Sequence, residues 1–452
     1  MNLSVLELEI PCLVVGGGPA GFGAASAALR GGCETIVADR HGFLGGMGTA
    51  AGLSCYLNHL GVDVDLSSPV YRSFRQQLID MKSHYYDAHT QADYYEPEVC
   101  KLGMEQAILK AGGKLLYHSI LSNVYREKDL WVAEFLSKGS RVRIRCRYLI
   151  DATGDADPSA MAGAGLFHGN QSSGATQPMT MVVQMGGFDP QAWAASGRRL
   201  IEGRYVAEGD QYAAQVSLAR SAGEWSIPRE NVALFWSMPH DPSRITVNGT
   251  RISGLSSCNA METTRAEVEG RRQAQELVAF FRKYIPGFEN VYLYQTGPQV
   301  GVRESRRIVG RYTLTEDDVR SARIPESSVM LCAYPIDVHS TEGTGTQYED
   351  NGSIYGIPWE CQLPVDLENV AAAGRCISAT HEAAGSFRVM PTCMGLGEAA
   401  GTAAALAWKN KDTLQSIAGA DIRHEMDRAH AAAGNLIPST QFSFGSHIPA
   451  QI

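Results

Sequence analysis

A glycine-rich turn between two short strands constrains the fold of this chain more than any other feature. An apolar run at residues 10–15 leads directly into Gly16-Gly17-Gly18-Pro19-Ala20-Gly21, and an Ala-rich segment at residues 22–29 is predicted to be helical. A second strand at residues 35–38 ends at Asp39. This G-x-G-x-x-G spacing, with a strand before it, a helix after it and an acid beyond the next strand, is typical of a dinucleotide-binding βαβ unit.

The glycines of this motif have separate physical tasks. Gly16 permits the tight turn, Gly18 lets a pyrophosphate approach the backbone, and Gly21 lets the helix pack closely on the sheet. The helix N-terminus then faces the phosphates, and Asp39 is placed to accept hydrogen bonds from ribose hydroxyls. The segment therefore predicts an α/β domain with a bound dinucleotide.

Two later strands favour FAD over NAD as this dinucleotide. Residues 148–155 (YLIDATGD) and residues 370–376 (VAAAGRC) are each predicted as a strand that ends in small residues. Residues 390–401 (MPTCMGLGEAAG) then begin a helix rich in small residues. Because extended ligands lie beyond the carboxyl ends of parallel strands, FAD is long enough to contact both ends of the chain. A second dinucleotide domain is not expected, since Gly395-Leu396-Gly397 follows a loop and not a strand.

Several stretches carry a resemblance to a known family. They are GGGPAG, ADRHGFLGGMGTAAG, DATGDAD, PGFEN, GVRESRRIVG, YPIDVH and AGRCISATHEAAGSFRVMPTCMGLGEAAGTAAALA. Together they resemble the FAD-dependent oxidoreductases of the glutathione-reductase-like superfamily, from about residue 10 to about residue 410. The resemblance implies non-covalent FAD, a Rossmann-type FAD-binding domain and an inserted α+β antiparallel-sheet substrate domain. Asp39 departs from the family, in which Glu is more usual, although Asp can still reach ribose hydroxyls.

The motif and the resemblance together predict the residues that contact FAD. These residues lie in the glycine-rich turn, at the end of the second strand, in the loop after it and at the later strand ends: Gly16, Gly18, Pro19, Ala20, Gly21, Asp39, Arg40, Gly45, Gly46, Met47, Thr49, Leu121, Ala152, Thr153, Gly154, Gly374, Arg375, Met394 and Gly395. The helix that begins near Thr392 is expected to direct its positive N-terminus toward the flavin.

Changes along the chain predict two closely connected domains and a tail. The FAD-binding domain comprises residues 1–56, 96–168 and 366–412, and the substrate domain with active-site segments comprises residues 57–95 and 169–365. Helices are predicted at residues 69–82, 101–111, 262–284, 392–408 and 420–433, short strands at 115–118, 121–126, 131–136 and 141–145, strand-like segments at 178–185 and 232–238, and a polar aromatic loop at 85–95. The helical tail at residues 413–452 would cap the domain or meet a partner subunit, which leaves a homo-oligomer open.

Four side chains are candidates for chemistry beside the flavin. Arg388 could hold a carboxylate or a developing oxyanion by paired hydrogen bonds, and His381 could move a proton near neutral pH. Alternatively, Arg388 ties its loop and His381 caps a strand. Asp337 and His339 are two residues apart on a predicted strand and so share a face, where they could form a base and its orienting partner. The alternative for this pair is a structural hydrogen bond.

Other residues are expected at the margins of the site. Residues 303–307 (RESRR) predict a buried ion-pair network that joins the two domains, with Arg303 as the member that could face the substrate. Cys55 and His59 could line the pocket. Aromatic residues in the inserted segments look more like a shaped pocket than an interaction face: Tyr334, Tyr348, Tyr355 and Trp359.

Composition excludes several classes of protein. The 452 residues carry a net charge of −9 with scattered Lys and Arg, which disfavours nucleic-acid binding. The sequence contains no run of about 18 apolar residues, so no membrane span is predicted. The N-terminus lacks a secretory pattern, and a cytoplasmic protein is therefore expected. The 10 cysteines include no C-x-x-C pair and are expected to be free thiols, which argues against a disulfide reductase. No metal site is expected.

The sequence therefore predicts an FAD-dependent oxidoreductase that moves a hydride between a small organic substrate and flavin N5, as a dehydrogenase, oxidase or reductase. A second, unidentified electron donor or acceptor completes the cycle. One alternative is a flavin-dependent monooxygenase, although Ala373-Gly374-Arg375-Cys376 stands where the hydroxylases have a Gly-Asp motif. The other alternative is a non-catalytic FAD-binding sensor.

Overall fold

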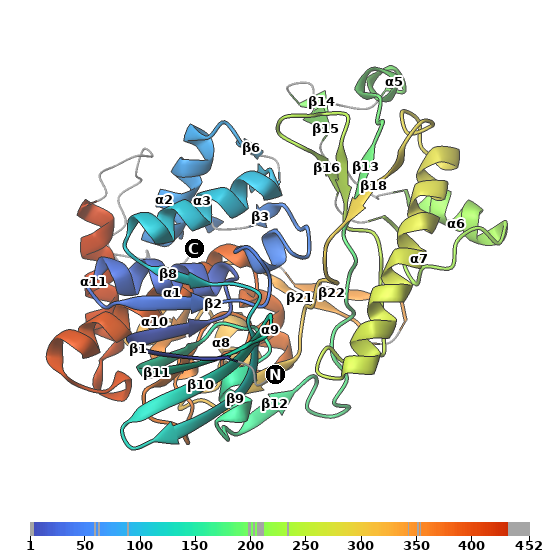
Figure 1. The fold of residues 1–452 in the computed structure, drawn as a ribbon. Coiled ribbons are helices and arrows are strands. Elements are labelled where there is room, and N and C mark those ends of the chain that lie inside the picture. Colours follow the sequence, from blue (N-terminus) through green and yellow to red (C-terminus); the bar gives the residue numbers. More distant parts are fainter. Residues whose placement is uncertain are drawn as a thin grey trace.

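Two lobes of different construction make up the molecule (Figure 1). The computed structural model describes residues 4–57, 60–61, 64–87, 90–197, 200–201, 204–205, 212–232, 235–341, 343–349, 352 and 354–432. The larger lobe combines the two ends of the described chain with its middle, and the smaller lobe is formed by β13, β16–β18 and the helices α5, α6 and α7.

The larger lobe is built on a mixed sheet with the strand order β8-β2-β1-β11-β10-β9, and β24 pairs with the end of β11. Its strands are β1 (Ser4–Val15), β2 (Thr35–Ala38), β8 (Lys114–Leu116), β9 (Ile120–Glu127), β10 (Leu130–Ser137), β11 (Ser140–Asp151) and β24 (Val370–Ala372). The strands β8, β2, β1, β11 and β24 run parallel. Val15 is in register with both Ala38 and Asp151, so the carboxyl ends of three strands lie side by side.

Glycines bring two helices into backbone contact above this sheet. They are α1 (Pro19–Arg30) and α10 (Met390–Asn410), which start on the same side of the lobe. A Cβ atom on Gly397 would lie 1.8 Å from the carbonyl oxygen of Ala20, and one on Gly401 would lie 2.0 Å from that of Ala24. These distances are far below van der Waals contact, so no larger residue fits without separating the helices.

Residues 69–95 pack on this helix pair, although the sequence places them with the substrate domain. The helix α2 (Pro69–Asp80) buries Tyr71 and Phe74 in the same apolar cluster as α1 and α10. The prediction of a loop at residues 85–95 is wrong. Two strands there, β6 (His84–Asp87) and β7 (Ala92–Tyr95), form a hairpin, and β7 also pairs with β3 (Cys55–Leu57). Stacked rings of Tyr85 and Tyr94, with centroids 5.0 Å apart, stabilise it across the strands.

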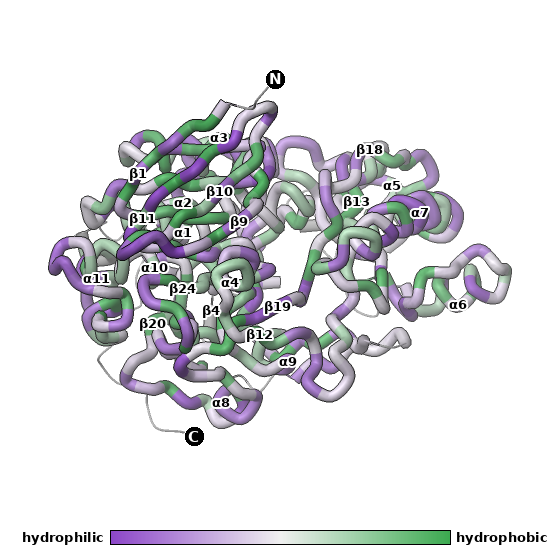
Figure 2. The backbone as a smooth tube through the Cα atoms, turned by 60° about the horizontal axis from the view of Figure 1, so that its bottom comes forward, coloured by the Kyte–Doolittle hydropathy of each residue, from purple (hydrophilic) through white to green (hydrophobic). Residues whose placement is uncertain are grey.

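The smaller lobe has its own antiparallel sheet and core. Its strand order is β16 (Phe235–Ser237), β17 (Ile245–Val247), β13 (Val183–Gly186) and β18 (Tyr292–Thr296). The long helix α7 (Ala260–Tyr284) packs Leu277 and Phe281 in an apolar cluster with Val183 and Val247 of the sheet. Much of the α7 trace is coloured as hydrophilic in Figure 2. The strand predicted at 178–185 is shorter than expected, because residues 179 and 180 form isolated bridges only.

A hairpin of β21 (Ile336–His339) and β22 (Thr346–Glu349) lies between the lobes (Figure 1). Ile336 packs with β20 (Ser328–Cys332), β23 (Tyr355–Pro358) and α9 (His381–Phe387) in a cluster that also includes Ala372 of the large sheet. Much of the segment 306–365, assigned from the sequence to the substrate domain, therefore packs on the larger lobe.

The remaining elements are short, apart from two helices. They are α3 (Pro97–Lys110), α4 (Asp157–Met161), α5 (Pro190–Ala195), α6 (Ala213–Ser221), α8 (Glu316–Arg320), α11 (Gly419–Ala432), β4 (Leu60–Gly61), β5 (Val64–Asp65), β12 (Leu166–His168), β14 (Leu200–Ile201), β15 (Arg204–Tyr205) and β19 (Arg306–Ile308). The helix α11 caps the larger lobe, because Ile422 and Met426 are buried in the cluster around α10. The rest of the predicted tail, residues 433–452, lies outside the described residues.

The close contact between α1 and α10 predicts how a methyl group added at Gly397 affects stability. Gly397→Ala should lower the free energy of unfolding by about 1–3 kcal/mol, because the backbones of α1 and α10 must move apart. Urea unfolding of the FAD-loaded protein measures this. Gly345→Ala is the control, since its Cβ would have only the Ser340 Cβ nearby, at 3.9 Å. An unchanged unfolding midpoint in Gly397→Ala would contradict the contact.

Candidate functional site

A cavity of about 580 Å³ joins the carboxyl ends of the large sheet to the β21–β22 hairpin and the smaller lobe. Its size is within the range of small-molecule and cofactor sites. One end is lined by the turn after β1, the end of β2 and the turn after β11, and the other end by Arg388, Asp337 and His339. The two ends have different chemistry.

The glycine-rich turn leaves room at one position and none at two others. Gly16 has a φ of +98°, and a Cβ on Gly21 would lie 1.8 Å from the Gly16 carbonyl oxygen. A Cβ on Gly18 would instead meet only the Cα of Gly46, at 3.8 Å. Gly18 lines the cavity, so the open space beside it belongs to a ligand that approaches the backbone.

Two helices begin at the cavity without a capping side chain. The N-cap residues are Gly18 for α1 and Val389 for α10, and no side chain in the described ranges caps either helix. Neither first turn contains an acidic residue. Because the first N–H groups of a helix and its dipole favour negative charge, both ends suit phosphates or an electron-rich ring.

Carboxylates complete this end of the cavity. Asp39 accepts hydrogen bonds from the N–H groups of Gly17 (2.6 Å) and His41 (2.7 Å), and its oxygens retain lone pairs for ribose hydroxyls. Asp155 pairs with Arg375 at 2.8 Å. Although burial raises the pKa of Asp155, the Arg375 guanidinium outweighs it and holds that pKa below its ordinary value.

Most of the residues predicted to contact FAD lie on this wall. They are Gly16, Gly18, Pro19, Ala20, Asp39, Arg40, Gly46, Met47, Leu121, Ala152, Thr153, Gly154, Gly374 and Arg375. Gly21, Gly45, Thr49, Met394 and Gly395 stand behind it and support it. Thr49 donates to the carbonyl of Leu44 (2.7 Å), for example, and the N–H of Gly45 donates to the carbonyl of Gly17 (2.8 Å).

These observations fit FAD. The uncapped ends of α1 and α10 would hold the phosphates and the flavin, and Asp39 would hold a ribose. The carboxyl ends of parallel strands at the cavity wall are where an extended dinucleotide lies in this type of sheet.

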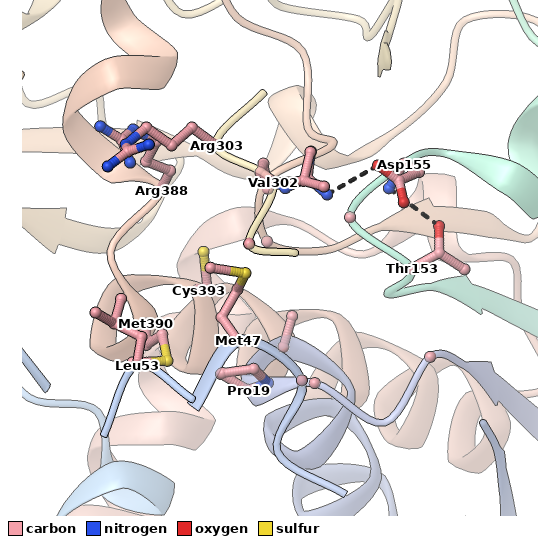
Figure 3. A pocket seen from close by; sticks show the side chains of 18 of the residues that line it. Pro19, Met47, Leu53, Thr153, Asp155, Val302, Arg303, Arg388, Met390 and Cys393 are labelled. Atoms are coloured by element: carbon pink, nitrogen blue, oxygen red, sulfur yellow. Dashed lines mark hydrogen bonds and ion pairs between the residues drawn. The ribbon is translucent and has the colours of Figure 1, made fainter. Parts of the chain in front are cut away.

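Arginines dominate the other end, as Figure 3 shows for Arg303 and Arg388. Arg388 donates from Nη2 to the carbonyl oxygen (2.9 Å) and the Oδ2 atom (3.2 Å) of Asp337. Arg303 donates to the carbonyl of Pro178 at 2.7 Å. Arg229 is a third cation on this wall, and it was missed because a lone Arg in a loop carries no local signal.

Asp337 and His339 lie beside these arginines and contact each other. The Nε2 atom of His339 is 3.5 Å from Oδ1 of Asp337, and its Nδ1 is 3.2 Å from the Thr346 hydroxyl. Burial, followed by repulsion from Arg303, lowers the pKa of His339 to about 3. Burial opposes ionisation of Asp337, but His339 and Arg388 keep its pKa below the ordinary value. At neutral pH the imidazole is therefore neutral and the carboxylate ionised.

His381 is placed differently from the other three catalytic candidates. Its Nδ1 atom is 2.9 Å from the Glu304 carboxylate, which also pairs with Arg307. His381 is buried and is not part of the cavity wall. The group belongs to the ion-pair network predicted at residues 303–307, so this placement favours a structural role for His381.

The remaining predicted residues divide between wall and core. Cys55, Tyr334 and Tyr348 line the cavity, whereas Tyr355 and Trp359 are buried in the core, where aromatic side chains pack without reaching a ligand. His59 lies outside the described residues. All 10 cysteines lie in the described ranges and none is disulfide-bonded.

Comparison with known proteins now identifies the chain. A family model described as FAD dependent oxidoreductase matches residues 11–426. The chain belongs to this family. This flavoprotein is accordingly an enzyme, and FAD is its cofactor. No curated protein matches its sequence.

Solved structures similar to this flavoprotein have low sequence identity to it. The p-nitrophenol 4-monooxygenase from Pseudomonas putida matches with a TM-score of 0.48 and 10% identity over 95% of this chain and 89% of that chain. A geranylgeranyl bacteriochlorophyll reductase-like protein from Thermoplasma acidophilum matches with a TM-score of 0.45 and 13% identity, over 94% of this chain and 83% of that chain. A flavoprotein/dehydrogenase from Cytophaga hutchinsonii matches with a TM-score of 0.43 and 11% identity, over 94% of this chain and 85% of that chain. Likeness at this level transfers neither reaction nor substrate.

The described part of the chain contains neither a membrane-spanning helix nor a cluster of metal ligands. Among its helices none combines the length and the apolar character needed to cross a membrane. Within the same ranges, no three His, Cys, Asp or Glu side chains come together as metal ligands could.

The open space at Gly18 predicts how FAD binding responds to a methyl group. Gly18→Ala should weaken FAD binding by about tenfold or more, because the new Cβ occupies ligand space, and should leave the stability of the apoprotein unchanged. Titration of the apoprotein with FAD by fluorescence measures the affinity. Wild-type affinity in this variant would show that FAD does not approach the turn.

The lowered pKa of His339 predicts a dependence of stability on pH. Between its folded pKa of about 3 and its ordinary value of 6.5, the unfolded chain binds a proton that the native state does not. The free energy of unfolding should therefore fall as the pH drops through this window, by up to about 1.4 kcal/mol per pH unit. In His339→Asn the decline between pH 6.5 and 4.5 should be shallower in urea unfolding. Equal slopes in both proteins would contradict the assignment.

Proposed function

We propose that this enzyme moves a hydride between flavin N5 and a small organic substrate that carries an anionic group. One observation carries the proposal: a single cavity contains both the features that fit FAD and the group Arg388, Asp337 and His339. When bound, FAD supplies the hydride chemistry, and the protein supplies binding, orientation and proton handling. We also propose that the fold is of the glutathione-reductase-like subtype and that FAD is bound non-covalently. The smaller lobe is the proposed substrate domain.

Arg388 is the proposed anchor of the substrate. Its Nη2 is engaged by Asp337, but its buried Nε has no hydrogen-bond partner among the described residues. A carboxylate or oxyanion can accept from this unused donor, and charge-assisted bonds of this kind are the strong ones. Binding the anion would also satisfy a polar atom that is otherwise buried without a partner.

His339 and Asp337 are the proposed proton-handling pair. Repulsion from Arg303 and Arg388 contributes to the low pKa of His339, and a bound anion offsets that repulsion. The imidazole therefore becomes a better base when the substrate is present, while Asp337 and Thr346 orient its two nitrogens. With Nε2–H donated to Asp337, Nδ1 is the basic nitrogen, and it can take the substrate proton in place of the hydrogen bond from Thr346.

The proposal is tested by anaerobic reduction of the purified enzyme. The visible flavin absorption should bleach on addition of one of a panel of small hydroxy, amino or saturated carboxylic acids. NADH and NADPH are tested in parallel. Bleaching by a nicotinamide alone would favour the reductase direction of the proposal or the monooxygenase alternative, and a flavin that none of these compounds bleaches would contradict the proposal.

Replacement of Arg388 separates substrate binding from cofactor binding. Arg388→Met should lower kcat/KM by about 30- to 100-fold with FAD content unchanged, because one charge-assisted interaction is lost. Arg388→Lys should recover part of the activity. Arg265→Met is the control, since it removes a positive charge from an exposed position on α7. Loss of FAD from both Arg388 variants would show that the residue is structural.

A further inference from the structure

The arginine end of the cavity, formed by Arg229, Arg303 and Arg388, contains more positive charge than the proposed function requires. These side chains come from three separate loops and line the same cavity. Asp337 is the one carboxylate on the described wall of this end, and His339 is neutral there. Three cations and one anion leave a charge of +2, in a chain whose net charge is −9.

The three guanidiniums differ in how they are balanced. Arg388 has an ion pair with Asp337, whereas the partners of Arg303 among the described residues are the carbonyl of Pro178 and the hydroxyl of Thr180. Arg229 is 6% exposed, and its guanidinium has no hydrogen bond or ion pair to any residue that the structure describes. Asp337 attracts both Arg229 and Arg303 electrostatically, but neither forms an ion pair with a carboxylate that the structure describes, so the cost of burying these two cations is only partly offset.

Mutual repulsion adds to this cost. Burial, then repulsion from Arg388 and Arg229, lowers the pKa of Arg303 to about 9. Burial, then repulsion from Arg251, lowers the pKa of Arg229 to about 10. Both values lie well above neutral pH, so both side chains stay charged. Arg303 is repelled by both Arg388 and Arg229, so the three guanidiniums act on one another within this end of the cavity.

Arg251 does not relieve the imbalance. Its Nη2 donates to the carbonyl oxygens of Ser340 and Gly345, at 2.8 Å each, and it stands behind the cavity wall. It therefore adds a fourth positive charge near the site. A monoanionic ligand at Arg388 would leave Arg229 without an ion-pair partner, whereas a dianion would balance the charge of +2 that Arg229, Arg303, Arg388 and Asp337 carry together.

We infer that the arginine end receives a small substrate with two carboxylate groups, one held by Arg388 and the other by Arg229, with Arg303 lining the same space. This inference rests on the proposed function and names its substrate class. Asn248 also lines this cavity, and its Oδ1 atom is buried without a hydrogen-bond partner among the described residues. It can accept from a hydroxyl or amino group of the substrate.

Isothermal titration calorimetry of the FAD-loaded enzyme tests the inference by binding and not by turnover. The probes are malonate, succinate and glutarate, the monocarboxylates acetate, propionate and butyrate, and inorganic phosphate. At least one dicarboxylate should bind about tenfold to hundredfold more tightly than the monocarboxylate of similar length. Equal affinities for the two classes would overturn the inference, and so would tighter binding of phosphate than of every dicarboxylate.

Variants of Arg229 identify the second anchor. Arg229→Met should bring dicarboxylate affinity to within about twofold of monocarboxylate affinity, and should leave monocarboxylate binding at Arg388 nearly unchanged. Arg229→Lys keeps the charge and should retain most of the preference, which also covers the case in which Arg229→Met does not fold. The exposed control Arg265→Met should bind as the wild type does. A preference retained in folded, FAD-loaded Arg229→Met would overturn the assignment.

The two proposals fail in different ways. A dicarboxylate that binds as expected, in an enzyme whose flavin neither an organic acid nor a nicotinamide bleaches, supports the dianion site and contradicts the hydride-transfer proposal. A monocarboxylate that binds more tightly than every dicarboxylate and bleaches the flavin supports hydride transfer and overturns the dianion site.

Discussion

Backbone contact between α1 and α10 is the constraint on which the site depends. The two helices are about 370 residues apart in the chain, yet Gly397 and Gly401 lie directly against the carbonyl oxygens of Ala20 and Ala24. Both helices begin at the cavity, so this contact sets the distance between their two positive ends. A ligand that uses both ends is therefore selected by length as well as by charge.

The sequence predicts the first βαβ unit well and the distant contacts poorly. The turn at Gly16–Gly21 and the strand ending at Asp39 follow from local spacing, because each residue answers to its nearest neighbours. The small residues of α10 indicated a buried helix, but not that Gly397 meets Ala20, since that contact depends on the tertiary structure. Arg229 was invisible for the same reason: only folding brings it to the wall that carries Arg388.

Charge is distributed unevenly along the cavity. Near the glycine-rich turn, Asp155 and Arg375 balance each other and Asp39 is satisfied by backbone N–H groups. At the opposite end, cations outnumber anions, and the Nε donor of Arg388 has no hydrogen-bond partner among the described residues. The first region is largely complete in itself apart from its uncapped helix ends, whereas the second requires charge from outside. This difference, more than the shape of the cavity, separates a cofactor region from a substrate region.

The attachments of the β21–β22 hairpin connect proton transfer to the relative position of the lobes. At its turn, Ser340 and Gly345 accept hydrogen bonds from Arg251 of the smaller lobe, while Asp337 at its base is held by Arg388 of the larger lobe. The hairpin is thus attached to the smaller lobe at its turn and to the larger lobe at its base. Any rotation of the smaller lobe must pull on the strand that carries His339. Motion of the smaller lobe would therefore move the imidazole of His339. Opening of the cavity would displace the base from its catalytic position at the same time.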